Sequence, residues 1–168
     1  MKAQVLMLRQ DDPAKCTAAK LAKFGLAEQV RRCSRSSIVL DPFSDITLSR
    51  EDNSAADSVC AIDCSWERIG ETKRLFRLAS QGLGRRLPAL LAANPVNYAK
   101  LNKLSSAEAL AGAVYILGDR DQAAAIMNKF KWGHTFLELN AEPLAEYSQA
   151  SRSEIESLEL QYFPKPSG

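Results

Sequence analysis

Residues 87–118 read LPALLAANPVNYAKLNKLSSAEALAGAVYILG, and this stretch decides how the chain around it folds. It opens with an apolar run over Leu87–Ala93, which predicts a buried strand. Asn94-Pro95 ends that run, because proline fixes φ, lacks an N–H group and forces the preceding residue out of the α region. The sequence therefore predicts a buried strand followed by a polar, kinked loop.

A helix follows this loop, and the sequence marks both of its ends. Ser105 and Glu108 have the spacing of a capping box, in which serine and glutamate satisfy each other's backbone N–H groups. Gly118 is suited to end the helix. Between these ends, apolar residues fall on one helical stripe, which predicts a helix over 106–117 with these inward residues: Leu110, Ala113, Val114 and Leu117.

Short apolar runs elsewhere in the chain predict further strands, at Ala3–Leu8, Ser36–Leu40 and Val59–Asp63. The last of these runs ends in a carboxylate. Ligands of open α/β sheets bind outside the carboxyl ends of the strands, so Asp63 is a candidate site residue.

Helical patterns separate these strands, which is typical of an α/β fold. We expect helices over Ala18–Phe24, from Trp66 to about Leu78, over Gln122–Phe130, and in the segments beyond Thr135, Glu142 and Ser153. Residues 45–56 are polar and turn-prone and are expected to be exposed. Residues 82–86 read as a loop, since they lack the ending of a phosphate-binding motif.

The bulk composition is that of an ordinary globular protein. The 168 residues are 46% hydrophobic and 25% charged, with a formal net charge of +2, which permits an RNA partner without requiring one. No stretch approaches the roughly 18 to 20 apolar residues that span a membrane, and we expect a cytoplasmic protein without a membrane partner. The four cysteines form no CxxC pair and the only histidine is distant, so no metal site is expected.

Several motifs resemble one known family in their order along nearly the whole chain. They are Asp63-Cys64-Ser65-Trp66, Leu87-Pro88, the run from Ala92 to Tyr98, Lys103-Leu104-Ser105, Glu108-Ala109 and the run from Lys129 to Gly133. In these motifs the chain resembles the small-subunit rRNA aminocarboxypropyltransferases, ribosome biogenesis proteins of archaea and eukaryotes. The N-terminal segment is also similar to part of a ribosome-recycling ATPase associated with iron–sulfur binding, but it lacks the necessary ligands.

The resemblance implies a fold, an activity and a cofactor. It implies an α/β protein with a small N-terminal α/β lobe (residues 1–80), which faces RNA and contributes to the cofactor site. A SPOUT-like lobe with a deep trefoil knot (residues 81–168) would bind S-adenosyl-L-methionine. The implied transferase attaches the 3-amino-3-carboxypropyl group to N3 of a uridine or methylated pseudouridine in small-subunit rRNA, as a monomer. Two alternatives stay open: a SPOUT-type RNA methyltransferase and a non-catalytic ribosome assembly factor.

The same resemblance, residue by residue, suggests a cofactor site. It implies that Thr17, Ile62, Leu87, Asn102 and Ser106 bind the cofactor. The apolar slot that an adenine requires adds Leu40 and Ala109 to the expected cofactor-binding residues. Trp66 is expected to shield the sulfonium methyl group. Asp63 has three possible roles: anchor for the cofactor's amino group, acceptor of the N3 proton of the base, or N-cap of the helix that follows it.

Basic clusters beside this site predict contacts with RNA phosphates. The expected RNA-binding residues are Lys20, Lys23, Arg31, Arg32, Arg85 and Arg86. Residues 129–133 alternate lysines with aromatics, which could stack an unpaired base. For Phe130 and Trp132 we favour a place in the core, because large aromatic side chains are usually buried.

Overall fold

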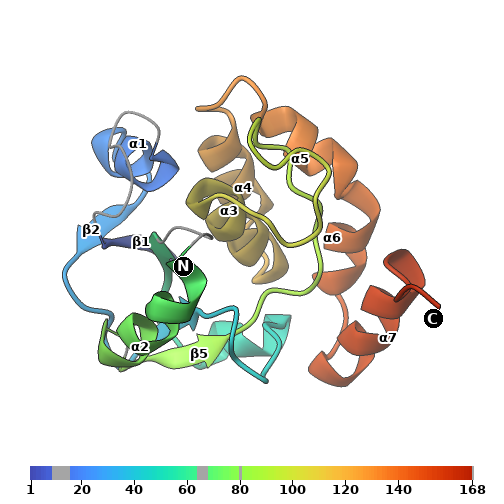
Figure 1. Cartoon of the computed structure of the whole chain (residues 1–168), viewed down its shortest axis with the longest axis horizontal. Coiled ribbons are helices and arrows are strands. Elements are labelled where there is room, and N and C mark those ends of the chain that lie inside the picture. Colours follow the sequence, from blue (N-terminus) through green and yellow to red (C-terminus); the bar gives the residue numbers. More distant parts are fainter. Residues whose placement is uncertain (9–15, 64–67, 80, 168) are drawn as a thin grey trace.

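The computed structural model of the chain describes residues 1–8, 16–63, 68–79 and 81–167 (Figure 1). A parallel sheet is built from the first half of the chain, and helices make up the second half. In chain order the elements are β1 (Lys2–Met7), α1 (Thr17–Lys23), β2 (Glu28–Val30), β3 (Ser37–Leu40), the 3₁₀ helix η1 (Arg50–Ser54), β4 (Ser58–Asp63), α2 (Ile69–Ala79), β5 (Leu83–Arg85), α3 (Ser106–Ile116), α4 (Arg120–Met127), α5 (Gly133–Leu139), α6 (Ala141–Tyr147) and α7 (Arg152–Tyr162).

The strands form one sheet in the order β2-β1-β4-β3-β5, and every neighbouring pair is parallel. Parallel strands are covered on both faces, so their sequences are nearly continuous apolar runs. All four residues of β3 and the first five of β4 are buried accordingly. The α/β class predicted from the sequence is confirmed.

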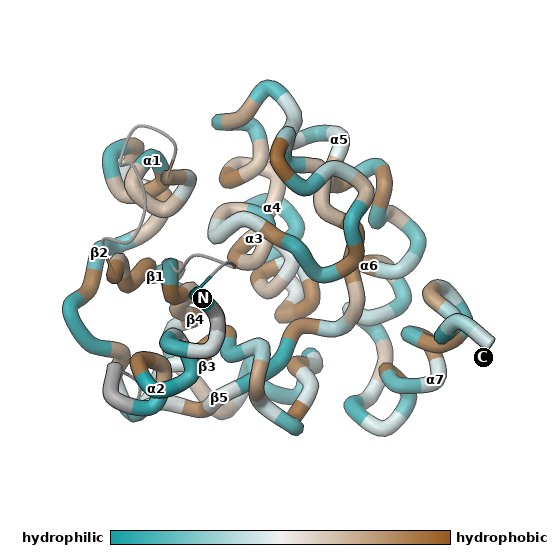
Figure 2. The backbone as a smooth tube through the Cα atoms, viewed as in Figure 1, coloured by the Kyte–Doolittle hydropathy of each residue, from teal (hydrophilic) through white to brown (hydrophobic). Residues whose placement is uncertain are grey.

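Helices cover the two faces of the sheet. Alternate residues of the strands, such as Val5 and Ala61, share one core cluster with residues of α1 and α3, which contact β1 and β4. On the other face Leu6 and Ile62 lie in a second cluster with Phe76 of α2. Figure 2 shows the hydrophobic stretches of the chain gathered in the strands and along the inner sides of the helices.

Most elements agree with the sequence predictions to within a few residues. The helix over 106–117 is α3, with the predicted capping box of Ser105 and Glu108, and all residues of its predicted stripe are buried. Gly118 ends it with a φ of 106°. The loop predicted over 82–86 is wrong, because β5 occupies most of that segment. Two short strands, β2 and β5, were not predicted. Each has only three residues, too few for a hydrophobic period.

The strand predicted over Leu87–Ala93 does not form, and this prediction is wrong. The segment is largely buried, but it lies outside the named strands, with single bridges at Arg86 and Leu91. Side chains from distant segments satisfy its backbone instead: Glu159 accepts from Ala89 N at 2.7 Å, and Asn140 binds both the N–H and C=O groups of Leu91. Buried backbone N–H and C=O groups need hydrogen-bond partners. An apolar run in the sequence does not reveal whether those partners are a neighbouring strand or side chains.

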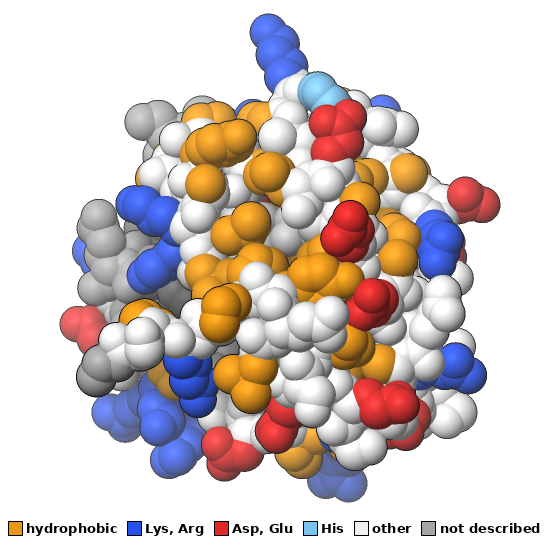
Figure 3. Space-filling model, turned by 90° about the vertical axis from the view of Figure 1, so that its right-hand side faces the viewer, with side chains coloured by type: hydrophobic (Ala, Val, Ile, Leu, Met, Phe, Trp, Pro, Cys, Tyr) orange, Lys and Arg blue, Asp and Glu red, His pale blue; other side chains and the backbone are white. Residues whose placement is uncertain are grey.

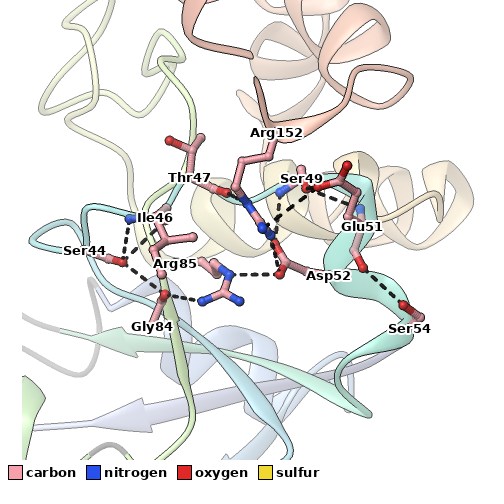
Figure 4. Close-up of polar contacts among 10 residues, drawn as sticks. All are labelled: Ser44, Ile46, Thr47, Ser49, Glu51, Asp52, Ser54, Gly84, Arg85 and Arg152. Carbon is pink, nitrogen blue, oxygen red and sulfur yellow. Dashed lines mark hydrogen bonds and ion pairs between the residues drawn. The ribbon is translucent and has the colours of Figure 1, made fainter. Parts of the chain in front are cut away.

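The exposed turn predicted over 45–56 is confirmed for most of its residues, but residues 47–49 and Asp52 are buried. Asp52 of η1 is only 1% exposed, and its Oδ1 atom binds Arg85 Nε at 2.9 Å and Arg152 Nη2 at 2.7 Å (Figure 4). Thr47, in the same segment, is also buried and its carbonyl accepts from Arg152 Nε. Asp52 can be buried in this polar stretch because its charge is paired with residues far away in the sequence.

One hydrophobic core spans the predicted boundary at residue 80. The first cluster joins Val5, Ile38 and Ala61 of the sheet with Leu90 and Leu110 of the second half. β5 also lies in the sheet although its residues follow residue 80. The division into two lobes stays a prediction. In the described part of the chain, no helix is long and apolar enough to span a membrane.

Candidate active site

Asp63 lies at the carboxyl end of β4, the middle strand of the sheet. From β1 the chain continues to β2 on one side of the sheet, whereas from β4 it continues through α2 to β5 on the other side. The ends of β1 and β4 therefore form the point where the strand order reverses. In open α/β sheets this is the usual place for a ligand.

The carboxylate of Asp63 accepts a hydrogen bond at each oxygen. The Cys16 thiol donates to Oδ2 at 3.0 Å, and the Ser106 hydroxyl donates to Oδ1 at 3.0 Å. Cys16 is the N-cap of α1 and Ser106 is the first residue of α3. The starts of two helices therefore meet at one half-buried carboxylate.

Thr17 completes this cluster. Its Oγ1 atom accepts a hydrogen bond from the backbone N–H of Ala107 at 3.1 Å, which joins the first residue of α1 to the first turn of α3. Thr17, Asp63 and Ser106 were predicted as site residues in three separate parts of the sequence, and the structure brings them together. Cys16 was not predicted, although its position directly before Thr17 was a usable signal.

The cluster lies at the start of α3 and includes a buried thiol. The N-terminus of α3 carries the positive end of the helix dipole, which stabilises a nearby negative charge. Burial, and next the hydrogen bond to Asp63, raise the pKa of Cys16 to about 11, so the thiol is a neutral donor near pH 7. The described part of α2 begins at Ile69 and residues 64–67 lie outside the described residues, so the N-cap interpretation of Asp63 stays a prediction.

Glu108 fixes the loop that leads into α3. This fully buried side chain accepts from Ala93 N at 2.6 Å, Asn94 N at 3.0 Å, Asn94 Nδ2 at 2.8 Å and Ser105 N at 2.7 Å. Four donors from both ends of the 93–105 loop converge on one carboxylate. The sequence predicted the capping contact with Ser105, but it carried no signal for the contacts with Ala93 and Asn94.

The remaining cofactor candidates lie around this loop and the adjoining strand ends. Leu40 ends β3 and is paired with both Ala61 and Arg85. Asn102 has a φ of 61°, and its backbone N–H and side-chain oxygen bind the C=O and N–H groups of Leu90. Ile62 is buried on the α2 face, whereas two half-buried candidates pack against the main core, Leu87 and Ala109.

Trp66, the residue predicted to shield the sulfonium methyl group, lies outside the described residues. Its role stays a prediction.

The predicted RNA-binding residues fall into two groups. Lys20, Lys23, Arg31 and Arg32 are all exposed. Arg85 and Arg86 instead have internal partners: Arg85 binds Asp52, and Arg86 binds Glu159 at 2.8 Å and Thr47 at 2.6 Å. These two guanidinium groups already pair with carboxylates inside the molecule, and their role as RNA contacts stays a prediction.

Two family models match consecutive parts of the chain. Residues 38–163 match a family model described as ribosome biogenesis protein, C-terminal, and residues 1–35 match one described as a possible Fer4-like domain in RNase L inhibitor. Those 35 residues contain two cysteines, Cys16 and Cys33. Within the described residues, no three His, Cys, Asp or Glu side chains are grouped as a metal site requires.

Proteins named 16S rRNA aminocarboxypropyltransferase are similar to the chain over almost its full length. The protein from Thermoplasma volcanium is 51% identical and the match covers 94% of this chain and 96% of that protein. The protein from Methanosarcina mazei is 48% identical over 90% of this chain and 88% of its own. The solved structure of the SAM-dependent rRNA:acp-transferase Tsr3 from Vulcanisaeta distributa has a TM-score of 0.83 and 37% identity, covering 94% of this chain and 88% of that one. The chain therefore belongs to the family of 16S rRNA aminocarboxypropyltransferases.

Proposed function

We propose that this protein transfers the 3-amino-3-carboxypropyl group of S-adenosyl-L-methionine to N3 of a uridine or methylated pseudouridine in small-subunit rRNA during ribosome biogenesis. The single observation that carries the proposal is the Asp63 cluster. The Asp63 carboxylate accepts two hydrogen bonds and lies at the switch point of a parallel sheet, beside the start of α3. The chain that carries this cluster belongs to the aminocarboxypropyltransferase family.

The residues of the cluster fit the amino-acid end of this cofactor. A carboxylate has about four lone-pair sites, and Cys16 and Ser106 occupy two of those on Asp63. The remaining sites can accept from an ammonium group, while the hydroxyl of Thr17 offers a further polar contact. We therefore assign Asp63 the role of cofactor anchor, because both of its oxygens are already held by hydrogen bonds and retain acceptor sites for an ammonium group.

When bound, the cofactor supplies a sulfonium, an activated leaving group that departs as methylthioadenosine. The protein's contribution is orientation: it must present the γ-carbon rather than the methyl carbon to the ring nitrogen. Asp63, held by Cys16 and Ser106, would fix one end of the aminocarboxypropyl chain. We assign the shielding of the methyl group to Trp66.

Cofactor labelled in either the methyl or the carboxyl group tests the reaction directly. With small-subunit rRNA as acceptor, we expect the carboxyl label to enter RNA and the methyl label to stay in methylthioadenosine. Entry of the methyl label alone would identify a methyltransferase and overturn the proposal. RNA binding without cofactor binding by calorimetry would identify an assembly factor.

Asp63→Asn separates the anchor role from the base role. Loss of an anchor weakens cofactor binding, so calorimetry should show a higher Kd, and kcat at saturating cofactor should keep its pH profile. Loss of a base would leave the Kd unchanged and lower kcat across the pH range. Cys16→Ser, which retains a donor to Asp63, is the matched control and should keep most of the affinity.

The finer architecture is also part of the proposal. We propose a SPOUT-like lobe over 81–168 with a deep trefoil knot, acting with the 1–80 lobe as a cytoplasmic monomer. The TM-score of 0.83 to Tsr3 supports this fold, as does the buried segment at 89–91, whose backbone is bound by Asn102, Asn140 and Glu159 from later in the chain. A crystal structure traced through residues 83–110 would test the knot, and light scattering would test the monomer.

A further inference from the structure

An exposed aromatic side chain and a lysine meet on the surface beside α1. Phe24, the C-cap of α1, is 50% exposed. Burial of a phenylalanine side chain would stabilise the fold, so its exposure is unfavourable for the free protein. Lys129, from the turn after α4, places its Nζ atom 5.2 Å from the centre of the Phe24 ring. Two segments more than 100 positions apart in the sequence therefore form one amphipathic surface.

Further cations belong to the same two segments. Lys20 and Lys23 on α1 and Lys131 beside Lys129 are exposed, and none of them has an ion pair within the described residues. Phe130 and Trp132, the aromatics between these lysines, pack against each other at 5.0 Å, with Phe130 only 8% exposed. The preference for a core position is thus confirmed for Phe130, and Phe24 is the aromatic that faces solvent.

This surface lies along the same helix as the candidate active site. Thr17, Lys20 and Phe24 are spaced by three and four residues, so they follow one side of α1. Thr17 contacts the first turn of α3 beside Asp63, and Phe24 lies at the opposite end. A helix of this length spans about 10 Å, so a strand of RNA could reach both ends at once.

We propose that Phe24, Lys20, Lys23 and Lys129 bind a single-stranded rRNA segment next to the modified nucleotide. In this Phe24–Lys129 surface, an unpaired base stacks on the Phe24 ring and the lysines contact the flanking phosphates. Stacking platforms with adjacent cations are the general means of binding single-stranded nucleic acid. This inference rests on the proposed function, because it assumes an rRNA substrate.

The charge distribution favours this side of the molecule over the opposite one. Exposed acidic residues accumulate on the last three helices: Glu138, Glu142, Glu146, Glu154 and Glu156. Figure 3 shows acidic side chains scattered over the face that carries α7, where they would repel phosphates. RNA is therefore expected to approach from the side of α1.

Fluorescence anisotropy with a labelled single-stranded RNA of the target region tests the surface in the full-length chain. For Phe24→Ala we expect about tenfold weaker binding, since removal of an aromatic platform costs about one to two powers of ten. Phe24→Leu keeps an apolar side chain without a ring and should lose nearly as much. Leu160→Ala is the matched control, because Leu160 on α7 is 51% exposed and should not contact RNA.

Salt dependence tests the lysines. For Lys129→Ala the slope of log K against log salt concentration should fall by about 0.7, the value for one contact with single-stranded nucleic acid. Lys165→Ala, which removes an exposed lysine near the C-terminus, should leave the slope unchanged.

The outcomes separate this inference from the proposed function. Calorimetric binding of S-adenosyl-L-methionine should be the same for the Phe24 and Lys129 variants as for the unsubstituted protein. Unchanged RNA affinity in these variants, with normal transfer of the carboxyl label, would overturn the surface and leave the proposed function intact. If the unsubstituted protein transfers no carboxyl label to rRNA, the proposed function fails instead.

Discussion

Replacing Glu108 by glutamine should destabilise the protein through two lost hydrogen bonds. The Glu108 carboxylate accepts from two groups at each oxygen, and glutamine can keep only the pair at Oε1, from Ala93 N and Asn94 N. Its amide NH₂ would face two other donors, Asn94 Nδ2 and Ser105 N. Asn94 cannot compensate by turning its amide over, because its oxygen already accepts from Asn97 N at 3.0 Å.

The expected loss is about 3 kcal/mol, since a hydrogen bond to a charged group contributes roughly 1.5 kcal/mol or more. In a chain of this size that lowers Tm by about 6 to 12 °C. Urea unfolding followed by circular dichroism, with an unchanged m value, measures the loss.

Glu154→Gln is the matched control for Glu108→Gln. Glu154 occupies the same capping-box position in α7, where it accepts from Ser151 N at 2.7 Å, but this pair is exposed. Water can replace its hydrogen bonds, so stability should change little. Equal losses in the two variants would refute the reasoning that burial of the four donors makes Glu108 important.

Three further predictions follow from other parts of the structure. Asp52→Asn should lower the free energy of unfolding by about 3 kcal/mol in urea titrations, because Arg85 would be left as a buried charge without a carboxylate. An unchanged free energy of unfolding would mean that the ion pair is dispensable. Alkylation of Cys16 by iodoacetamide, followed by mass spectrometry, should accelerate with pH up to about 11 rather than levelling near 9, since the raised pKa keeps the thiol protonated; a plateau at 9 would contradict burial. Trp66→Ala should weaken both cofactor binding by calorimetry and transfer of the carboxyl label, and normal transfer would remove Trp66 from the site.

The sequence predicted well what depends on neighbouring residues. Asn94-Pro95 ends the buried segment where a turn begins. The capping box of Ser105 and Glu108 lies at the start of α3, as predicted. These signals are local, because proline geometry and helix capping act over a few residues. Asp63 was predicted at the end of its strand for the same reason, since an apolar run that ends in a carboxylate is visible in one short window.

What the sequence did not reveal depends on partners far along the chain. Arg85 and Arg86 look like a free basic cluster, yet their carboxylate partners are 33 and 73 positions away. The thiol of Cys16 meets Asp63 across 47 positions. No local period encodes such pairs, because they exist only after the strands and helices have packed. Asp52 was assigned to an exposed turn for this reason, although the fold buries it between two arginines.

The first turn of α3 couples the parts of the site to one another. Glu108 holds the preceding loop, Ser106 orients Asp63, and Ala107 binds Thr17 at the start of α1. Because these are consecutive residues of one turn, a shift of the turn moves all three contacts together. Glu108→Gln should therefore raise the Kd for the cofactor as well as lower stability, even though Glu108 itself is buried away from the cluster. Thr17 begins α1 and Phe24 is its C-cap, so the contact between Thr17 and Ala107 also sets where the proposed RNA surface lies relative to Asp63.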